Sequence, residues 1–146
     1  MSNQILKTYL IPSSQAMEKL GEALCQALMT PLNYNKVIYL NGDLGAGKTT
    51  LTRGILRFKQ FKGAVKSPTY TLIEEYDFED VSIYHFDLYR LKSVEEAYDF
   101  GIEDYLQTTG WLFIEWPDII KNHLDNDYHE IWLSISDNNK RKVTLK

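Results

Sequence analysis

The stretch 42–50, GDLGAGKTT, constrains this chain most, because it fits the pattern G-x-x-x-x-G-K-[ST]. Its glycines allow backbone amides to turn inward and approach an anion closely. A short apolar run at 36–40 leads into the stretch and a helical pattern over 48–58 follows it, which distinguishes it from a chance match in a Gly-rich turn. We therefore predict a nucleoside triphosphate site formed by Gly42, Asp43, Gly45, Ala46, Gly47, Lys48, Thr49 and Thr50.

Each residue type in the stretch has a chemical reason. We expect the Lys48 ammonium to reach the β- and γ-phosphates, the Thr49 hydroxyl to bind Mg²⁺, and Thr50 to donate to the α-phosphate. The first turn of the following helix adds free N–H groups and the positive end of its dipole. The guanine-reading pattern Asn-Lys-x-Asp is absent, so we predict ATP as the substrate and Mg²⁺ as the cofactor.

Two apolar runs end in an acidic residue, Asp87 in VSIYHFD and Glu115 in WLFIE. Ligands of α/β sheets gather at the carboxyl ends of strands, and Mg²⁺ prefers oxygen ligands. We therefore expect one or both of these acids near Mg²⁺, and we hypothesise that Asp87 acts together with Lys48 in catalysis. A turn or capping aspartate, and a salt-bridged strand terminus, remain the simpler interpretations of the two acids.

Weaker signals surround these acids. In KSPTYTL, Thr69 or Thr71 is placed to lie near a γ-phosphate, although a plain strand start fits equally well. His85 lies inside an apolar run, where a core histidine is commoner than a catalytic one. Trp116 is either a core residue or an exposed contact beside the site.

The alternation of patterns predicts a single-domain α/β fold over 1–146, a P-loop NTPase-like mixed sheet with a parallel core and antiparallel strands, flanked by helices. A capping box, formed by Ser93 and Glu96, is expected to start a short helix that stops at Gly101. The expected strands are 5–11, 36–40, 70–78, 81–88, 111–116, 130–136 and 142–146, and the longer helices run from Ser13 or Ser14 to about Thr30 and over 48–58.

Composition narrows the class of partner. The net charge is −4, and only four of the sixteen basic residues are arginines, which do not cluster. Strong direct binding to nucleic acid is therefore disfavoured. The chain has no signal-peptide pattern and no apolar run approaching ~18 residues, so we expect a cytoplasmic protein without membrane association.

Four motifs in this order, GDLGAGKTT, KSPTYTL, YHFDLYRL and FIEWP, resemble the TsaE (YjeE) family of small bacterial P-loop ATPases over nearly the whole chain. The resemblance implies an ATPase required for threonylcarbamoyl modification of adenosine beside the anticodon of tRNAs. Such proteins do not transfer the group themselves. They associate with the proteins TsaD and TsaB, and contact with tRNA is expected to be indirect or weak.

The resemblance also assigns roles by position. It implies that Lys48 and Thr49 hold phosphate and Mg²⁺, that Glu115 is the second protein ligand of Mg²⁺, and that Asp87 is needed for hydrolysis. Thr69 and Thr71 match a switch-like segment, and Trp116 matches the tryptophan that follows the glutamate.

Other interpretations remain open. A small-molecule kinase would need an acceptor pocket and a lid, for which no insertion stands out, and a non-hydrolysing ATP-gated interaction module would use the same loop. Since no arginine finger is evident, we expect slow hydrolysis that partners accelerate. For the adenine pocket we expect the segment 8–14 and the region near Arg141.

Overall fold

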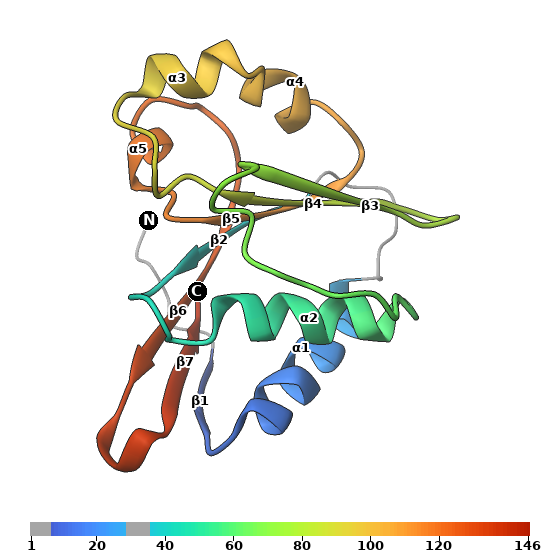
Figure 1. Cartoon of the computed structure of the whole chain (residues 1–146), viewed down its shortest axis with the longest axis vertical. Helices are drawn as coiled ribbons and strands as arrows, with labels where there is room; N and C mark the ends of the chain where they lie inside the picture. Colours follow the sequence, from blue (N-terminus) through green and yellow to red (C-terminus); the bar gives the residue numbers. More distant parts are fainter. Residues whose placement is uncertain (1–6, 29–35) are drawn as a thin grey trace. The chain divides into compact units, whose positions relative to one another are not determined.

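The computed structural model describes residues 7–28 and 36–146, which belong to two compact units (Figure 1). Unit 1 is formed by 1–32, 41–67 and 130–146, and unit 2 by 33–40 and 68–129. Each unit combines strands and helices, and both parallel and antiparallel strand pairs occur. The predicted mixed α/β class is confirmed, whereas the assignment of 1–146 to one domain stays a prediction.

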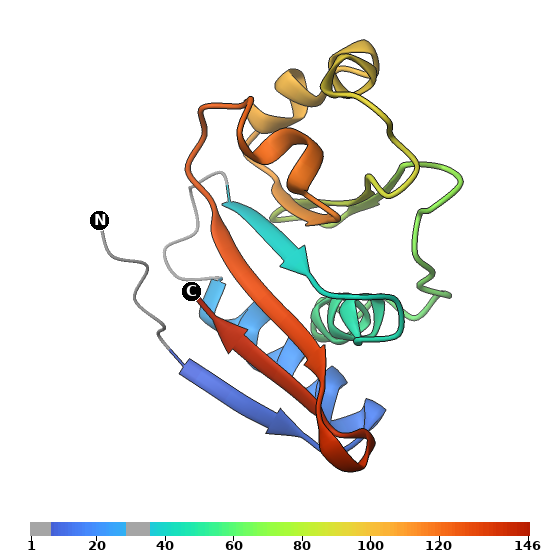
Figure 2. The same cartoon turned by 90° about the vertical axis from the view of Figure 1, so that its left-hand side faces the viewer.

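The sheet of unit 1 is antiparallel, in the order β1-β7-β6 (Figure 2). Its strands are β1 (Lys7–Ile11), β6 (His129–Ile135) and β7 (Arg141–Leu145). The turn between β6 and β7 holds Asn138 and Asn139 at φ 62° and 59°. Asparagine tolerates this left-handed region better than most residues. The predicted C-terminal strand pair across this turn is confirmed.

Two helices of unit 1, α1 (Ser14–Leu28) and α2 (Lys48–Phe58), cross at unusually short range. A Cβ atom added at Gly21 would lie 2.3 Å from the Leu51 carbonyl oxygen, and one at Gly54 would lie 2.1 Å from that of Glu18. Only glycine fits such a crossing. The predicted cap is Ser13, whose Oγ accepts the Ala16 amide at 3.1 Å. The predicted helix end near Thr30 lies outside the described residues.

Unit 2 orders its strands β2-β5-β4-β3. They are β2 (Lys36–Asn41), β3 (Ile73–Asp77), β4 (Ser82–Asp87) and β5 (Trp111–Glu115). The pairs β2/β5 and β5/β4 are parallel, while β4/β3 is an antiparallel hairpin, as predicted. Three short helices, α3 (Val94–Asp99), α4 (Ile102–Leu106) and α5 (Asp118–Lys121), contribute to its core, which contains Val37, Tyr39, Phe86, Leu88, Val94, Ala97, Ile102, Leu112, Ile114 and Ile120.

Two local predictions were wrong, and two short helices were missed. The strand expected from residue 70 begins only at Ile73, because Leu72 takes φ 68° and its N–H donates to Pro68 O at 2.8 Å, which closes a turn. The capping box does not form, since Ser93 makes no side-chain cap and Glu96 instead accepts the Lys92 amide at 3.4 Å. The helices α4 and α5 were not predicted.

Among residues 7–28 and 36–146, no helix has the length and apolarity needed to cross a bilayer.

Candidate functional site

The predicted phosphate-binding loop, residues 42–49, lies in unit 1 and has the backbone of an anion cradle. Gly45 and Gly47 take φ 80° and 109°, a region that glycine enters at little cost. At Gly42 an added Cβ would lie 2.5 Å from the carbonyl oxygen of Leu133 in β6, so this position is restricted to glycine by close packing. The Leu51 N–H donates to Gly47 O at 2.9 Å, and α2 begins here with its first N–H groups toward the loop.

Lys48 is held inside this loop. Its side chain is buried, and its Nζ donates to Gly42 O at 2.5 Å, which holds the ammonium against the loop backbone. Its own carbonyl accepts the Thr52 hydroxyl at 3.1 Å, which ties the first turn of α2 together. Thr49 is partly buried at the same helix start, and Asp43, whose carbonyl accepts the Ala46 amide at 3.1 Å, is exposed.

A pocket of about 280 Å³ adjoins the loop within unit 1. Its lining includes residues of the segment 8–14 and Arg141, both of which were expected at an adenine pocket. It also includes Met17 and Asn139, which were not predicted to lie there. Arg141 donates from Nε to Gly45 O at 3.1 Å and from Nη1 to Asn139 O at 2.7 Å. The full lining is Ile11, Ser13, Ser14, Met17, Gly45, Gly47, Thr50, Asn139 and Arg141.

The two predicted acids lie side by side in unit 2. Asp87 pairs with Glu115 in the parallel register of β4 and β5, and Glu115 pairs with Leu40 of β2. Both carboxyl groups are almost completely buried, at 2% and 3% exposure. Three parallel strands thus end in one row, and the chain enters the glycine loop two residues after Leu40. This is the sheet edge where α/β proteins bind ligands.

Hydrogen bonds to both oxygens fix the carboxylate of Asp87. Thr69 Oγ1 donates to Oδ2 at 2.8 Å, and the Tyr89 amide donates to Oδ1 at 2.9 Å. The turn at Leu72 delivers Thr69, because the Asp87 amide donates to Leu72 O at 3.0 Å. Of the two predicted threonines, only Thr69 joins this acid; Thr71 donates instead to Glu74 Oε1 at 3.0 Å on an exposed surface.

Glu115 has a histidine partner. Nε2 of His85 lies 2.5 Å from Oε2 of Glu115, and the imidazole is fully buried. Its Nδ1 has no hydrogen-bond partner among the described residues. His85 therefore orients Glu115 and is more than a core side chain. One feature of the sequence could have indicated this role for His85. It lies two residues from Asp87 on a strand, so the two side chains point to the same face of the sheet.

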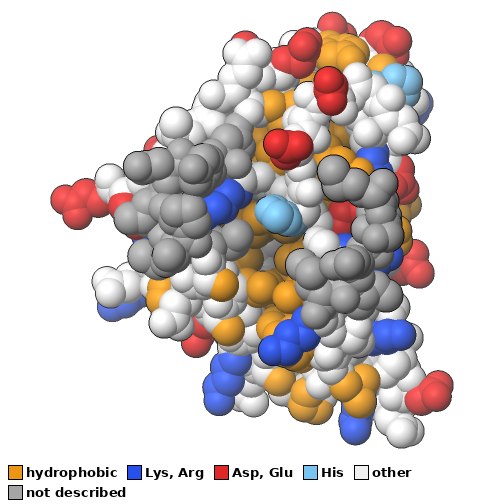
Figure 3. All heavy atoms as spheres, turned by 180° about the vertical axis from the view of Figure 1, so that it is seen from behind, with side chains coloured by type: hydrophobic (Ala, Val, Ile, Leu, Met, Phe, Trp, Pro, Cys, Tyr) orange, Lys and Arg blue, Asp and Glu red, His pale blue; other side chains and the backbone are white. Residues whose placement is uncertain are grey.

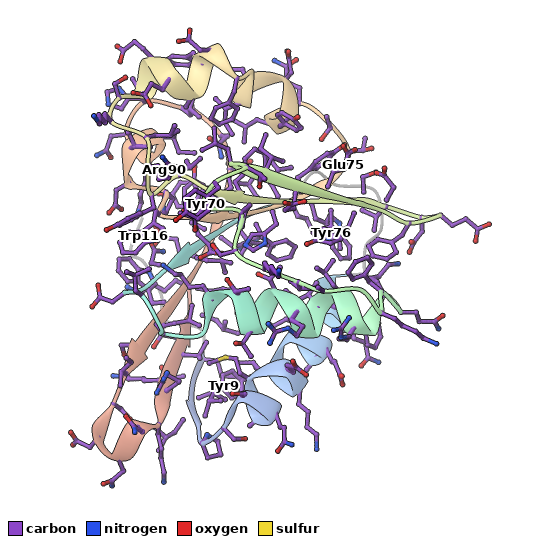
Figure 4. The ribbon with its side chains drawn as sticks, viewed as in Figure 1. Tyr9, Tyr70, Glu75, Tyr76, Arg90 and Trp116 are labelled. Carbon is purple, nitrogen blue, oxygen red and sulfur yellow. The ribbon has the colours of Figure 1, made fainter. Side chains whose placement is uncertain are left out.

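Aromatic side chains follow each acid along the chain. Trp116 takes φ 56°, a strained conformation for a bulky residue, and its ring centroid lies 4.9 Å from that of Tyr89. Tyr70 is 85% exposed, and the Arg90 guanidinium lies 5.0 Å from its ring centroid. Figure 4 labels Tyr70, Arg90 and Trp116, which come from three different segments of unit 2. We call Tyr70, Tyr89, Arg90 and Trp116 the aromatic patch.

The side chains present fit a cation that arrives with a phosphate ligand. Within the part of the chain that the structure describes, no group of three or more His, Cys, Asp and Glu side chains is arranged to hold a metal. Thr49 of unit 1 carries a hydroxyl and Glu115 of unit 2 a buried carboxylate, and both are hard oxygen donors. Mg²⁺ commonly takes one or two protein oxygens, substrate phosphates and waters.

The sequence resembles known proteins over most of its length. Residues 11–143 match the sequence model of the family "Threonylcarbamoyl adenosine biosynthesis protein TsaE". The tRNA threonylcarbamoyladenosine biosynthesis protein TsaE of Haemophilus influenzae is 50% identical over 113 residues, which cover 76% of this chain and 71% of that protein. The protein of the same name from Rickettsia conorii is 41% identical over 136 residues, covering 91% and 74%.

A solved structure shows the same fold. The crystal structure of YdiB from Bacillus subtilis superposes with a TM-score of 0.78 and covers 99% of this chain and 87% of that one. The sequence identity is 23%, so this likeness bears on the fold alone.

Proposed function

Because the chain belongs to the TsaE family, we propose that it is a P-loop ATPase acting in tRNA threonylcarbamoyladenosine biosynthesis. The observation that carries the proposal is the loop 42–49, which combines left-handed glycines, the start of α2 and a lysine ammonium already inside the loop. Backbone amides and a helix N-terminus in this arrangement favour a polyphosphate.

Two parts of unit 1 would bind the nucleotide, one its phosphates and the other its nucleoside. The Lys48 ammonium exchanges the Gly42 carbonyl for β- and γ-phosphate oxygens, a stronger charge-assisted contact. The adjoining pocket receives the nucleoside, with Arg141 and Asn139 at its rim and Met17 as an apolar surface for the base. Thr50, which also lines this pocket, is placed to donate to the α-phosphate.

The buried acids of unit 2 support hydrolysis. Glu115, held by His85, would bind Mg²⁺ together with Thr49, and the ion when bound neutralises charge on the phosphates. Asp87 would orient the attacking water, because Thr69 and the Tyr89 amide already fix both of its oxygens. Phosphoryl transfer depends mainly on such positioning and charge neutralisation.

The aromatic patch supports a partner-dependent rate. Tyr, Trp and Arg are the residues most enriched at binding hot spots. Each member of the patch adjoins a site residue in sequence: Tyr70 follows Thr69, Tyr89 and Arg90 lie close after Asp87, and Trp116 follows Glu115. We propose the proteins TsaD and TsaB as partners, whose binding here would adjust Thr69 and Asp87 and accelerate a slow intrinsic reaction.

The test is nucleotide binding by calorimetry and phosphate release, both with Mg²⁺, for the wild type, Lys48→Ala and the matched control Lys142→Ala. We expect Lys48→Ala to weaken ATP binding by about 10- to 100-fold, since a hydrogen bond to a charged group contributes roughly 1.5–3 kcal/mol. Lys142→Ala, at an exposed position of β7, should leave ATP affinity unchanged. Unchanged affinity in Lys48→Ala would refute the phosphate site.

Hydrolysis should also rise when the TsaD–TsaB complex is added. Phosphate release without any acceptor distinguishes an ATPase from a small-molecule kinase, and ATP binding without release would indicate a non-hydrolysing module. A rate that stays flat with the partners present would argue against partner activation and leave the nucleotide site intact.

A further inference from the structure

A long segment, most of it in unit 1, contains cations but no acids. Residues 44–73 include six Lys and Arg side chains and not one Asp or Glu. Two of these cations precede the last turn of α2: Lys48 belongs to the phosphate loop, and Arg53 donates to Glu18 at 3.4 Å and to Val65 O at 3.2 Å. The other four, Arg57, Lys59, Lys62 and Lys66, lie in the ten residues that end α2 and follow it. We call residues 57–66 the basic turn.

The basic turn has a defined shape. Gln60 takes φ 67° and reverses the chain, with the amides of Gln60 and Phe61 donating to Arg57 O at 2.9 Å and Leu56 O at 3.0 Å. The Arg57 guanidinium then closes the turn by donating to Phe61 O at 2.7 Å and Gly63 O at 2.8 Å. A ligand that binds here would therefore lose little affinity to ordering of the backbone.

Its outer surface suits a polyanion. Lys62 and Lys66 are exposed, and Arg57 and Lys59 are partly exposed. The Phe58 ring, 38% exposed, belongs to the same ten residues, while the ring of Phe61 packs so closely on Gly63 that an added Cβ there would lie 2.6 Å from it. Cations beside an exposed aromatic ring are typical of surfaces that bind nucleic-acid backbone and stack on a base. An acidic protein surface would need no such ring.

We propose that the basic turn binds RNA, with its lysines on backbone phosphates and Phe58 against an unpaired base. RNA is the polyanion to expect, because the family's biosynthetic role concerns tRNA, so the proposal rests on that part of the proposed function and not on ATP hydrolysis. It goes against the expectation from the net charge of −4, which averages over the whole chain. Local charge decides where a phosphate binds.

The position of the turn makes the site compatible with bound nucleotide. The 11 residues of α2 separate the phosphate loop at its start from the basic turn at its end. A helix of that length spans roughly 16 Å. RNA at the turn and ATP at the loop would therefore occupy opposite ends of one helix and bind together without competing.

The experiment is fluorescence anisotropy of a labelled, unmodified tRNA transcript titrated with the full chain over a range of salt concentrations. The double variant Lys62→Gln/Lys66→Gln is compared with Lys140→Gln/Lys142→Gln, which removes the same charge from exposed positions in and beside β7. We expect the first pair to weaken binding at least 10-fold and to lower the salt slope by roughly 1.5, since each phosphate contact contributes about 0.7–0.9. The control pair should change affinity less than 3-fold.

Two further variants separate the possible explanations. Phe58→Ala should weaken binding of RNA about 5-fold or more but leave binding of polyglutamate unchanged. Lys48→Ala should retain full RNA affinity even though it loses ATP, so a failure of the ATP site is distinguishable from a failure of the RNA site. Circular dichroism establishes that every variant is folded.

Three outcomes would overturn the proposal. One is unchanged RNA affinity in Lys62→Gln/Lys66→Gln, and another is an equal loss in both lysine pairs, which would indicate attraction by total charge alone. The third is sedimentation showing that the turn holds two copies of the chain together while RNA does not bind.

Discussion

The two compact units differ sharply in charge. Unit 1 contains 12 Lys and Arg against 5 Asp and Glu, a net charge of +7, whereas unit 2 contains 4 against 15, a net charge of −11. On the face drawn in Figure 3, blue Lys and Arg side chains lie beside orange hydrophobic ones. The formal net charge of the whole chain hides this division.

The difference in charge matches a difference in chemistry. Unit 1 holds the features suited to anions: the glycine loop, Lys48, Arg141 and the basic turn. Unit 2 holds the buried acids, Asp87 and Glu115, each with its own hydrogen-bond partners. A positive field assists binding of a triphosphate, while buried carboxylates suit a cation and a polarised water. Four substitutions test how far this division of roles extends.

Asp87→Asn is expected to have the largest effect. The amide keeps an oxygen for the Thr69 hydroxyl but loses the negative charge, so turnover should fall about 100-fold or more while ATP affinity changes less than 3-fold. Single-turnover phosphate release measures turnover, and calorimetry measures ATP affinity. Asp77→Asn is the matched control, because Asp77 also ends a strand and accepts a hydroxyl, that of Ser82 at 2.6 Å. Equal losses of affinity and turnover would place Asp87 in binding.

Gly54→Ala tests the packing of unit 1. The new methyl group would lie 2.1 Å from Glu18 O, so α1 and α2 must separate. Such overpacking costs roughly 1–3 kcal/mol, and the gain from alanine's helix propensity is about 1 kcal/mol. We expect a net loss of up to about 2 kcal/mol in urea unfolding, and less than 0.5 kcal/mol for the exposed α1 change Gln26→Ala. A more stable Gly54→Ala would contradict the close crossing.

Arg141→Ala should weaken ATP binding moderately. The variant removes the hydrogen bond to Gly45 O, which connects β7 to the phosphate loop, and the bond to Asn139 O in the turn before β7. We expect about a 10-fold loss of affinity in calorimetry, equivalent to ~1.4 kcal/mol, with turnover at saturating ATP nearly unchanged. Lys142→Ala is the neighbouring control. Loss of turnover alone would show that Arg141 acts in the chemical step.

Tyr76→Phe should have the smallest effect, and only at alkaline pH. Burial first, and the charge of Glu74 second, raise the pKa of Tyr76 above its usual value of 10.0. A raised pKa means that folding favours the protonated phenol, so its contribution to stability is complete below pH 10 and declines as the pH rises above it. Because phenylalanine cannot ionise, the unfolding free energy of Tyr76→Phe should fall less than that of the wild type between pH 9 and 11. Tyr70→Phe, at an 85% exposed position, should follow the wild type.

Local features were predicted well from the sequence. The span of α2 and the glycine loop were correct, because the loop pattern, the flanking apolar run and the helical spacing all lie within about 20 residues. The β3/β4 hairpin was also correct, since its strands are adjacent in sequence. The start of β3 was wrong because a tertiary hydrogen bond, from the Asp87 amide to Leu72 O, supports a left-handed residue that no propensity indicates.

Side-chain partnerships were mostly beyond the sequence. Arg141 and Gly45 are 96 residues apart, and His85 and Glu115 are 30 apart, so each pair meets only through strand pairing or packing. The register of β4 on β5 puts Asp87 beside Glu115. A pattern gives residue types and spacings along one segment but not the register between two.

The sequence by itself determined the phosphate loop, the helix that follows it and the mixed α/β class, because glycine geometry and apolar spacing are properties of short segments. Only the tertiary structure decided which oxygen, nitrogen or ring each site residue contacts. Those contacts depend on the register between strands and on the close packing of helices at their glycines.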